Sequence, residues 1–185
     1  MTIALTRRLF TTDEYDRMIE SGILTKADRV ELIRGEIFAM SPVGPRHAAI
    51  VNRLTRLIGR YLQERAIVSV QNPIRLSDHS EPEPDVALLH NRPDFYEQAH
   101  PEPEDVFLAI EVADSTRSYD VEVKADLYAE AGIQELWILD VAAKEVLVYR
   151  QPTASGYAIV KTHGHGDSLV LLAFPDIRLD SRGFF

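Results

Sequence analysis

The chain has 185 residues, of which 45% are hydrophobic and 26% are charged, and its formal net charge is −9. These ordinary globular values predict a single folded domain over residues 1–185 rather than a disordered chain. The absence of cysteine excludes disulfides, thiolate metal ligands and cysteine nucleophiles, and it is typical of a reducing cytoplasm. No signal-peptide core and no apolar run of about 20 residues is present, so we expect a cytoplasmic protein without a membrane association.

The charge is distributed unevenly along the chain. Residues 1–80 contain 12 Lys/Arg and 9 Asp/Glu, whereas residues 81–185 contain 8 and 20. Such asymmetry indicates separate surfaces with separate tasks, and an acid-rich surface that keeps the protein in solution is an equally good interpretation.

The first elements are predicted from local signals. Thr11 and Glu14 have capping-box spacing, which predicts a short helix ending at Gly22. The segment RVELIRGEIFAM then predicts two strands joined by a two-residue turn at Arg34 and Gly35. Two prolines and a glycine in residues 41–45 predict a loop.

Residues 46–65 form the clearest predicted helix of the first half. Apolar residues recur at helical spacing on one stripe, namely Ile50, Leu54, Leu57, Ile58 and Tyr61. Arg53, Arg56 and Arg60 cluster roughly 110° from the centre of that stripe. A solvated helix face is the more common explanation of such a cluster, and a strip that contacts nucleic-acid phosphates is the alternative.

Two acidic residues stand beside predicted strands in the middle of the chain. Prolines keep residues 81–85 (EPEPD) extended, so Asp85 lies directly before the strand VALLH. The apolar run that starts at Val106 leads directly into Glu111, where an unpaired buried carboxylate would be very costly. Strand, loop, helix and strand follow over residues 105–141, which is the size of a βαβ unit with parallel strands.

The helix predicted over residues 119–131 carries Asp120, Lys124 and Tyr128 on one face, because they are spaced four residues apart. If the strands of Asp85 and Glu111 are neighbours, their carboxylates meet at one edge of the sheet. Two carboxylates completed by a backbone carbonyl and waters suit Mg²⁺, and the Lys124 ammonium would assist. A structural ion-pair network among these residues is the alternative.

Four fragments in a fixed order carry a family resemblance. PEPDVALL, LAIEVADST, a D-x-x-x-K-x-x-x-Y pattern and AGIQELWILD resemble the PD-(D/E)xK nuclease superfamily, and most closely the bacterial Uma-two family of restriction-endonuclease-like proteins. The similarity covers about Phe10 to Tyr149 and includes the hairpin and His47. It implies an α/β fold with a restriction-endonuclease-like mixed β-sheet core flanked by helices, preceded by an N-terminal helix and hairpin.

The resemblance also implies roles for individual residues. Asp85 is similar to the metal-binding Asp of the PD motif, and Glu111 to the acid of (D/E)xK. Ala113 stands where the superfamily has its lysine, and in the Uma-two relatives the lysine lies on the following helix, where this chain has Lys124. Supporting positions implied by the resemblance are Glu31, Glu36, His47, Asp120 and Tyr128.

Two functions from different classes follow. The first is an endonuclease that hydrolyses DNA phosphodiester bonds with Mg²⁺, or Mn²⁺ in its place, held by Asp85 and Glu111 with Lys124 assisting. The second is a catalytically silent module on the same fold that acts in binding or assembly. A homodimer is expected in the first case, since many nucleases cut two strands with two copies.

Overall fold

A central mixed sheet organises the computed structural model, which describes residues 7–25, 27–114 and 123–185. The strand order is β3-β4-β5-β6-β7-β8, and β5 and β6 are parallel while the other neighbouring pairs are antiparallel. The bounds are β3 (Ile67–Val70), β4 (Val86–Leu89), β5 (Val106–Ala113), β6 (Glu135–Asp140), β7 (Glu145–Thr153) and β8 (Gly156–His163). The parallel pairing predicted for residues 105–141 is therefore confirmed.

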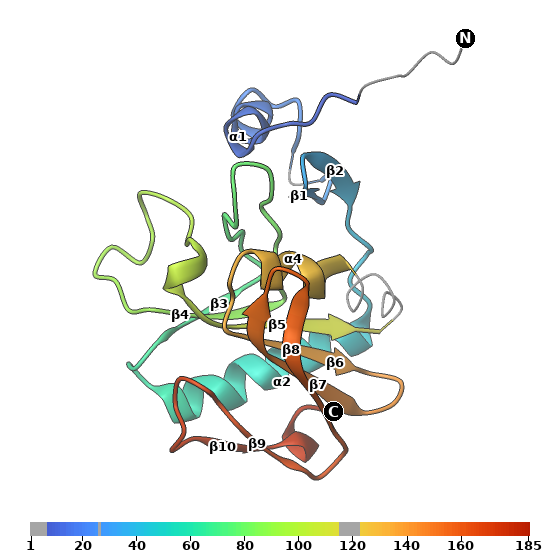
Figure 1. Cartoon of the computed structure of the whole chain (residues 1–185), viewed down its shortest axis with the longest axis vertical. Coiled ribbons are helices and arrows are strands. Elements are labelled where there is room, and N and C mark those ends of the chain that lie inside the picture. The colour runs from blue at the N-terminus through green and yellow to red at the C-terminus, as the bar shows by residue number, and fades with distance from the viewer. Residues whose placement is uncertain (1–6, 26, 115–122) are drawn as a thin grey trace.

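Helices cover both faces of this sheet (Figure 1). Helix α2 (Pro45–Leu62) lies on one face together with the hairpin of β9 (Ser168–Val170) and β10 (Arg178–Asp180), and the short helix α4 (Ala125–Glu130) lies on the other. The inner strands β4, β5 and β6 are buried on both faces because they alternate between two apolar cores: Ile110 packs on the α2 side and Ala109 on the α4 side. Trp137 is fully buried on the α2 side.

The N-terminal elements form as predicted. Helix α1 (Thr12–Glu20) begins with the expected capping box between Thr11 and Glu14. Strands β1 (Val30–Ile33) and β2 (Glu36–Ala39) pair antiparallel around Arg34 and Gly35, whose φ angles of 49° and 78° suit a tight hairpin turn. This hairpin stands at the same end of the molecule as α1 (Figure 1).

Replacing Gly35 by alanine should destabilise the protein more than replacing Gly22. Both glycines have positive φ, 78° and 75°, which costs an alanine about 1–3 kcal/mol. A Cβ on Gly35 would also lie 2.6 Å from Leu9 Cβ, whereas nothing lies within 4 Å of a Cβ on Gly22. Urea denaturation of both variants measures the difference, and equal losses of stability would show that the Leu9 contact is unimportant.

Several local predictions differ from the structure. Tyr61 was expected on the buried stripe of α2 but is 51% exposed, because the buried face turns toward Val51 and Leu62. Of the helix predicted over 119–131, residues 119–122 lie outside the described residues, and α4 covers Ala125–Glu130 of the remainder. None of the described helices is long and apolar enough to span a membrane.

Candidate active site

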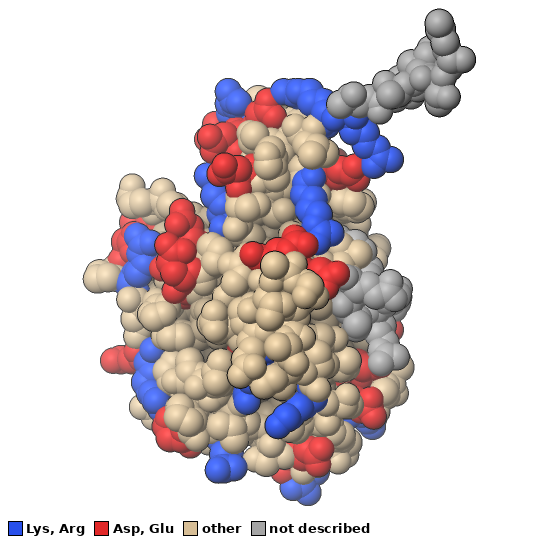
Figure 2. All heavy atoms as spheres, viewed as in Figure 1, with Lys and Arg blue, Asp and Glu red and all other residues tan. Residues whose placement is uncertain are grey.

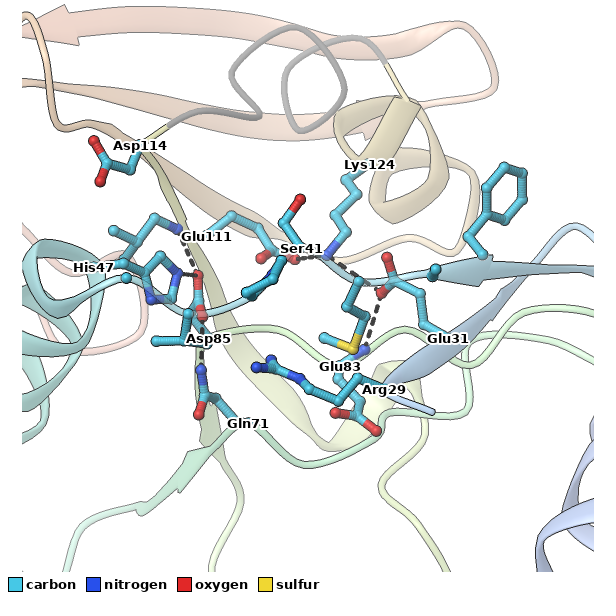
Figure 3. Close-up of a pocket in the computed structure, with 17 residues that line it drawn as sticks. Arg29, Glu31, Ser41, His47, Gln71, Glu83, Asp85, Glu111, Asp114 and Lys124 are labelled. Atoms are coloured by element: carbon cyan, nitrogen blue, oxygen red, sulfur yellow. Dashed lines mark hydrogen bonds and ion pairs between the residues drawn. The ribbon is translucent and has the colours of Figure 1, made fainter. Parts of the chain in front are cut away.

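The sheet register brings Asp85 and Glu111 side by side. Val86 is paired with Ile110 in the antiparallel β4–β5 ladder, so the residue before β4, Asp85, stands next to Glu111. Strand alternation turns Glu111 away from the α2 core, to which Ile110 and Val112 belong, and toward α4. Both carboxylates line the same pocket (Figure 3).

Three neighbours fix the orientation of Asp85. Its Oδ2 accepts a hydrogen bond from the backbone N–H of Val112 at 2.8 Å and lies 2.9 Å from Nε2 of His47. Its Oδ1 accepts a hydrogen bond from the side-chain amide of Gln71 at 3.2 Å. His47 comes from the first turn of α2 and Gln71 follows β3, so three separate elements hold this carboxylate in place.

Lys124 lies between two buried carboxylates. Its Nζ is 3.1 Å from Glu111 Oε1 and 3.3 Å from Glu31 Oε2, and all three residues are at most 5% exposed. Glu31 comes from β1 and also accepts the backbone N–H of Glu83 at 3.4 Å. Lys124 precedes α4, so it joins the N-terminal hairpin to the central sheet, and it does not face bulk solvent.

Tyr128 supports Glu111 from helix α4. Its hydroxyl donates a hydrogen bond to Glu111 Oε1 at 2.9 Å. Burial, and then the nearby negative charge of Glu111, raise the pKa of Tyr128 well above its ordinary value. The stability that the protonated hydroxyl contributes is therefore fully present below the ordinary tyrosine pKa and is lost only as the pH rises through the raised one.

The variant Tyr128→Phe should lower the free energy of unfolding by about 1.5–3 kcal/mol, because it removes a hydrogen bond to a charged group. The loss should be equal at pH 6 and pH 9, since the hydroxyl stays protonated at both. Tyr157→Phe is the matched control, because its hydroxyl donates to the backbone carbonyl of Ile133 outside the pocket. Urea denaturation at both pH values measures this, and a pH-dependent difference would contradict the assignment.

The pocket has a volume of about 370 Å³ and is strongly charged (Figure 3). Its acids are Glu31, Glu83, Asp85, Glu111 and Asp114, and its Lys and Arg side chains are Arg29 and Lys124. Burial, and then the charge of Glu31, raise the pKa of Glu83 above its ordinary value. The five acids outnumber the two Lys and Arg side chains, so negative charge exceeds positive charge in the pocket. This excess favours a cation as one of its ligands.

Five polar residues of the pocket were not among the predicted site residues, namely Arg29, Ser41, Gln71, Glu83 and Asp114. Glu83 carried a usable signal, because it lies two residues before Asp85 in an extended segment and so faces the same side. Gln71 carried none, since only the β3–β4 pairing brings it to Asp85.

Other residues predicted for the site lie away from the pocket. Glu36 does not line it and forms an ion pair with Arg7 at 2.6 Å. Arg53, Arg56 and Arg60 are exposed along α2 and do not line it either. Asp120 lies outside the described residues.

The donor set of Asp85 and Glu111 fits Mg²⁺. Carboxylate oxygens are the ligands of hard cations, and Mg²⁺ is commonly bound through one or two carboxylates while it keeps several waters. Among the described residues, the group of three potential ligands within 4.8 Å of one another lies elsewhere, at Asp16, Glu81 and His100. A cation at the pocket would therefore depend on water for much of its coordination.

The group of Asp16, Glu81 and His100 is a poorer metal site. The Arg75 guanidinium forms ion pairs with both Asp16 and Glu81, and its Nε is 3.2 Å from Glu81 Oε2. A metal ion would have to displace a cation that already neutralises these acids. We therefore interpret this group as a structural ion-pair network that attaches α1 to the rest of the chain.

A solved structure with the same fold defines the fold class of this protein. A crystal structure described as "a putative nuclease belonging to DUF820" from Anabaena variabilis aligns with 95% of this chain and 97% of its own, with a TM-score of 0.71 and 18% sequence identity. The predicted α/β restriction-endonuclease-like fold, with a mixed sheet flanked by helices, is therefore confirmed.

Residues 12–182 match the family model Uma2, described as "Putative restriction endonuclease", and the chain belongs to this family. Family and fold together support a nuclease. The comparison with curated proteins found no match.

Proposed function

We propose that the protein is a metal-dependent endonuclease that hydrolyses DNA phosphodiester bonds in the pocket of Asp85, Glu111 and Lys124. The observation that carries this proposal is the meeting of two carboxylates, one directly before β4 and one within β5, with a buried lysine in one pocket. Burying these charges without a function would be costly.

The residues of the pocket would have separate roles in hydrolysis. Asp85 and Glu111 would hold Mg²⁺ or Mn²⁺, which when bound supplies a Lewis acid and lowers the pKa of a water. His47, Gln71 and the N–H of Val112 would keep the Asp85 carboxylate in its binding orientation. The Lys124 ammonium, which carries protons at Nζ, would donate a hydrogen bond to a phosphate oxygen as charge develops on it.

Helix α2 is the proposed contact surface for the DNA backbone. It contains Arg46, Arg53, Arg56 and Arg60 and no acidic residue, in a chain whose net charge is −9. Among the described residues, no carboxylate lies within ion-pair distance of Arg53, Arg56 or Arg60, whereas many other arginines are paired with one. Basic and acidic side chains are interspersed over the face shown in Figure 2, whereas α2 has basic side chains and no acidic one.

Replacing Arg53, Arg56 and Arg60 together by glutamine should weaken DNA binding and its salt dependence. The slope of log K against log[salt] should become shallower by about 0.9 for every duplex phosphate that the variant no longer neutralises, and by about 0.7 for a single strand. Fluorescence anisotropy at several salt concentrations measures the slope, and Arg178→Gln, an exposed arginine on β10, is the control. An unchanged slope in the triple variant would exclude α2 as the contact surface.

Metal titration with plasmid DNA tests the proposed function. The wild type should cut plasmid with Mg²⁺ or Mn²⁺ and not with EDTA, and calorimetry should detect metal binding. Glu111→Gln should lose both, whereas His100→Ala should keep both because it alters only the group near Arg75. Metal binding that is lost in His100→Ala and kept in Glu111→Gln would overturn the proposal.

The second candidate, a catalytically silent module, is favoured by one observation. Lys124 is engaged by Glu31 as well as Glu111, which is also the geometry of a structural ion-pair network. Absence of both metal binding and cleavage in the wild type would select this candidate. The homodimer, the cytoplasmic location and the single domain over residues 1–185 stay predictions.

A further inference from the structure

The two basic side chains of the pocket differ in their partners. Lys124 is held between Glu31 and Glu111, at 3.3 and 3.1 Å. Arg29 also lines the pocket, but no carboxylate of the described residues lies within ion-pair distance of its guanidinium, and no described acceptor is hydrogen-bonded to it. The guanidinium of Arg29 therefore has hydrogen-bond donors open to a ligand.

The Arg29 side chain is directed into the pocket. Figure 3 shows it reaching from the residue before β1 toward the side of the pocket that contains Asp85 and Gln71. Its charge also acts on a pocket acid. Burial, and then the charge of Glu31, raise the pKa of Glu83, and the charge of Arg29 opposes this rise. The guanidinium thus influences Glu83 without forming an ion pair with it.

The backbone of Arg29 is held from both sides. Its carbonyl accepts the N–H of Met40, which follows β2, at 2.8 Å. Before it, the Asp28 carboxylate closes a turn by accepting the backbone N–H of Thr25 at 2.6 Å. Arg29 has a φ of 43°, which is uncommon for a residue other than glycine and persists only where the surrounding structure determines it. A side chain on a fixed backbone loses less entropy when it binds a ligand.

An anionic substrate needs positive charge in this pocket. Each phosphodiester carries a negative charge, and five acids outnumber two basic side chains here. A cation would offset the charges of Asp85 and Glu111, and Lys124 is already paired. The guanidinium of Arg29 is left to meet the phosphate, and its planar fork suits two phosphate oxygens at once.

We propose that Arg29 binds the phosphate that is hydrolysed, through two hydrogen bonds to its non-bridging oxygens. Arg29 would approach the phosphate from the start of the N-terminal hairpin, while the acids that hold the metal approach it from the central sheet. This inference deepens the proposed function and rests on it. It makes the hairpin part of the substrate site.

Plasmid cleavage with Mg²⁺ tests this inference. Arg29→Gln should lower kcat/KM about 10²- to 10³-fold, the loss typical of one preorganised donor at a reacting group. Arg29→Lys should recover only part of this loss, because an ammonium keeps the charge but cannot form two parallel hydrogen bonds. Calorimetry should show that both variants still bind Mn²⁺, since the guanidinium is not a metal ligand.

Arg34→Gln is the matched control for Arg29→Gln. Arg34 lies in the same hairpin and has a similar φ of 49°, but its guanidinium is paired with Glu130 at 2.8 Å and does not line this pocket. Its replacement should leave cleavage unchanged. Thermal melting checks that Arg29→Gln is folded. Normal cleavage by folded Arg29→Gln, or loss of Mn²⁺ binding in it, would overturn the inference.

A double variant separates phosphate binding from a purely structural role. If Arg29 served only to offset the charge of Glu83, adding Glu83→Gln would restore cleavage to Arg29→Gln. If Arg29 binds the phosphate, the double variant should cleave about 10²-fold more slowly than Glu83→Gln alone. Full restoration would therefore overturn the inference.

Protection by inorganic phosphate separates this inference from the proposed function. Phosphate titrated in Mg²⁺ should raise the melting temperature of the wild type and of Arg34→Gln more than that of Arg29→Gln, because a ligand of the folded state stabilises it. Wild-type cleavage that persists in Arg29→Gln overturns the inference and leaves the nuclease in place. Arg29-dependent protection without any cleavage supports the phosphate site and overturns the nuclease. A wild type that shows neither property overturns both.

Discussion

Lys124→Met should abolish cleavage and also destabilise the fold. The ammonium is the cation between Glu31 and Glu111, at 3.3 and 3.1 Å, and it is 5% exposed. Loss of one preorganised hydrogen-bond donor at a reacting group commonly lowers kcat about 10²- to 10³-fold. Removing one partner of a buried ion pair typically costs about 3–5 kcal/mol, because the remaining charges stay buried without compensation.

A double variant separates the two effects of Lys124→Met. Adding Glu31→Gln removes one of the two uncompensated carboxylates, so stability should partly recover while cleavage stays absent. Lys161→Met, on the exposed side of β8, is the matched control and should change neither property. Urea denaturation and plasmid cleavage are the measurements. Normal cleavage by folded Lys124→Met would remove this residue from the mechanism.

Asp85→Asn should lose metal binding and cleavage while it stays close to the wild type in stability. The amide oxygen can still accept the Val112 N–H, so the local backbone keeps its partner. The negative charge that would hold the cation is gone, and we expect cleavage to fall at least 10²-fold, a loss typical of a residue that acts at the reacting group.

Asp114→Asn is the matched control for Asp85→Asn. Asp114 lines the same pocket but is paired with Arg46 at 3.7 Å rather than placed beside Glu111. Its replacement should leave metal affinity and cleavage within about threefold of the wild type, since an exposed ion pair contributes little. Calorimetry with Mn²⁺ and plasmid cleavage test both variants. Equal losses in the two would mean that the pocket needs overall negative charge rather than Asp85.

Local signals made the fold largely predictable. The Thr11–Glu14 capping box and the Arg34–Gly35 turn depend on residues close in sequence, and both form as predicted. The boundary of the buried face of α2 was harder to predict from the sequence. Tyr61 has an apolar ring at the right spacing, but only the position of the sheet decides that Val51 and Leu62 are covered instead.

The two acids of the site were predictable because each stands next to or within an apolar strand. The placement of Asp85 before β4 and of Glu111 within β5 was visible in the sequence, and the register brings them together. Arg29 and Gln71 were not predictable, because nothing in their local sequence distinguishes a pocket residue from a surface one. Glu36, on the outer part of the hairpin, shows that membership of an element does not place a side chain in the site.

The position of Lys124 has a consequence for the order in which the molecule matures. Its two carboxylate partners come from the N-terminal hairpin and from the central sheet, which are distant in sequence. Contacts of this kind form late, because a long loop must close before they contribute. We therefore expect a nascent or partly folded chain to be catalytically inactive. It should become active only when the N-terminal hairpin docks on the central sheet.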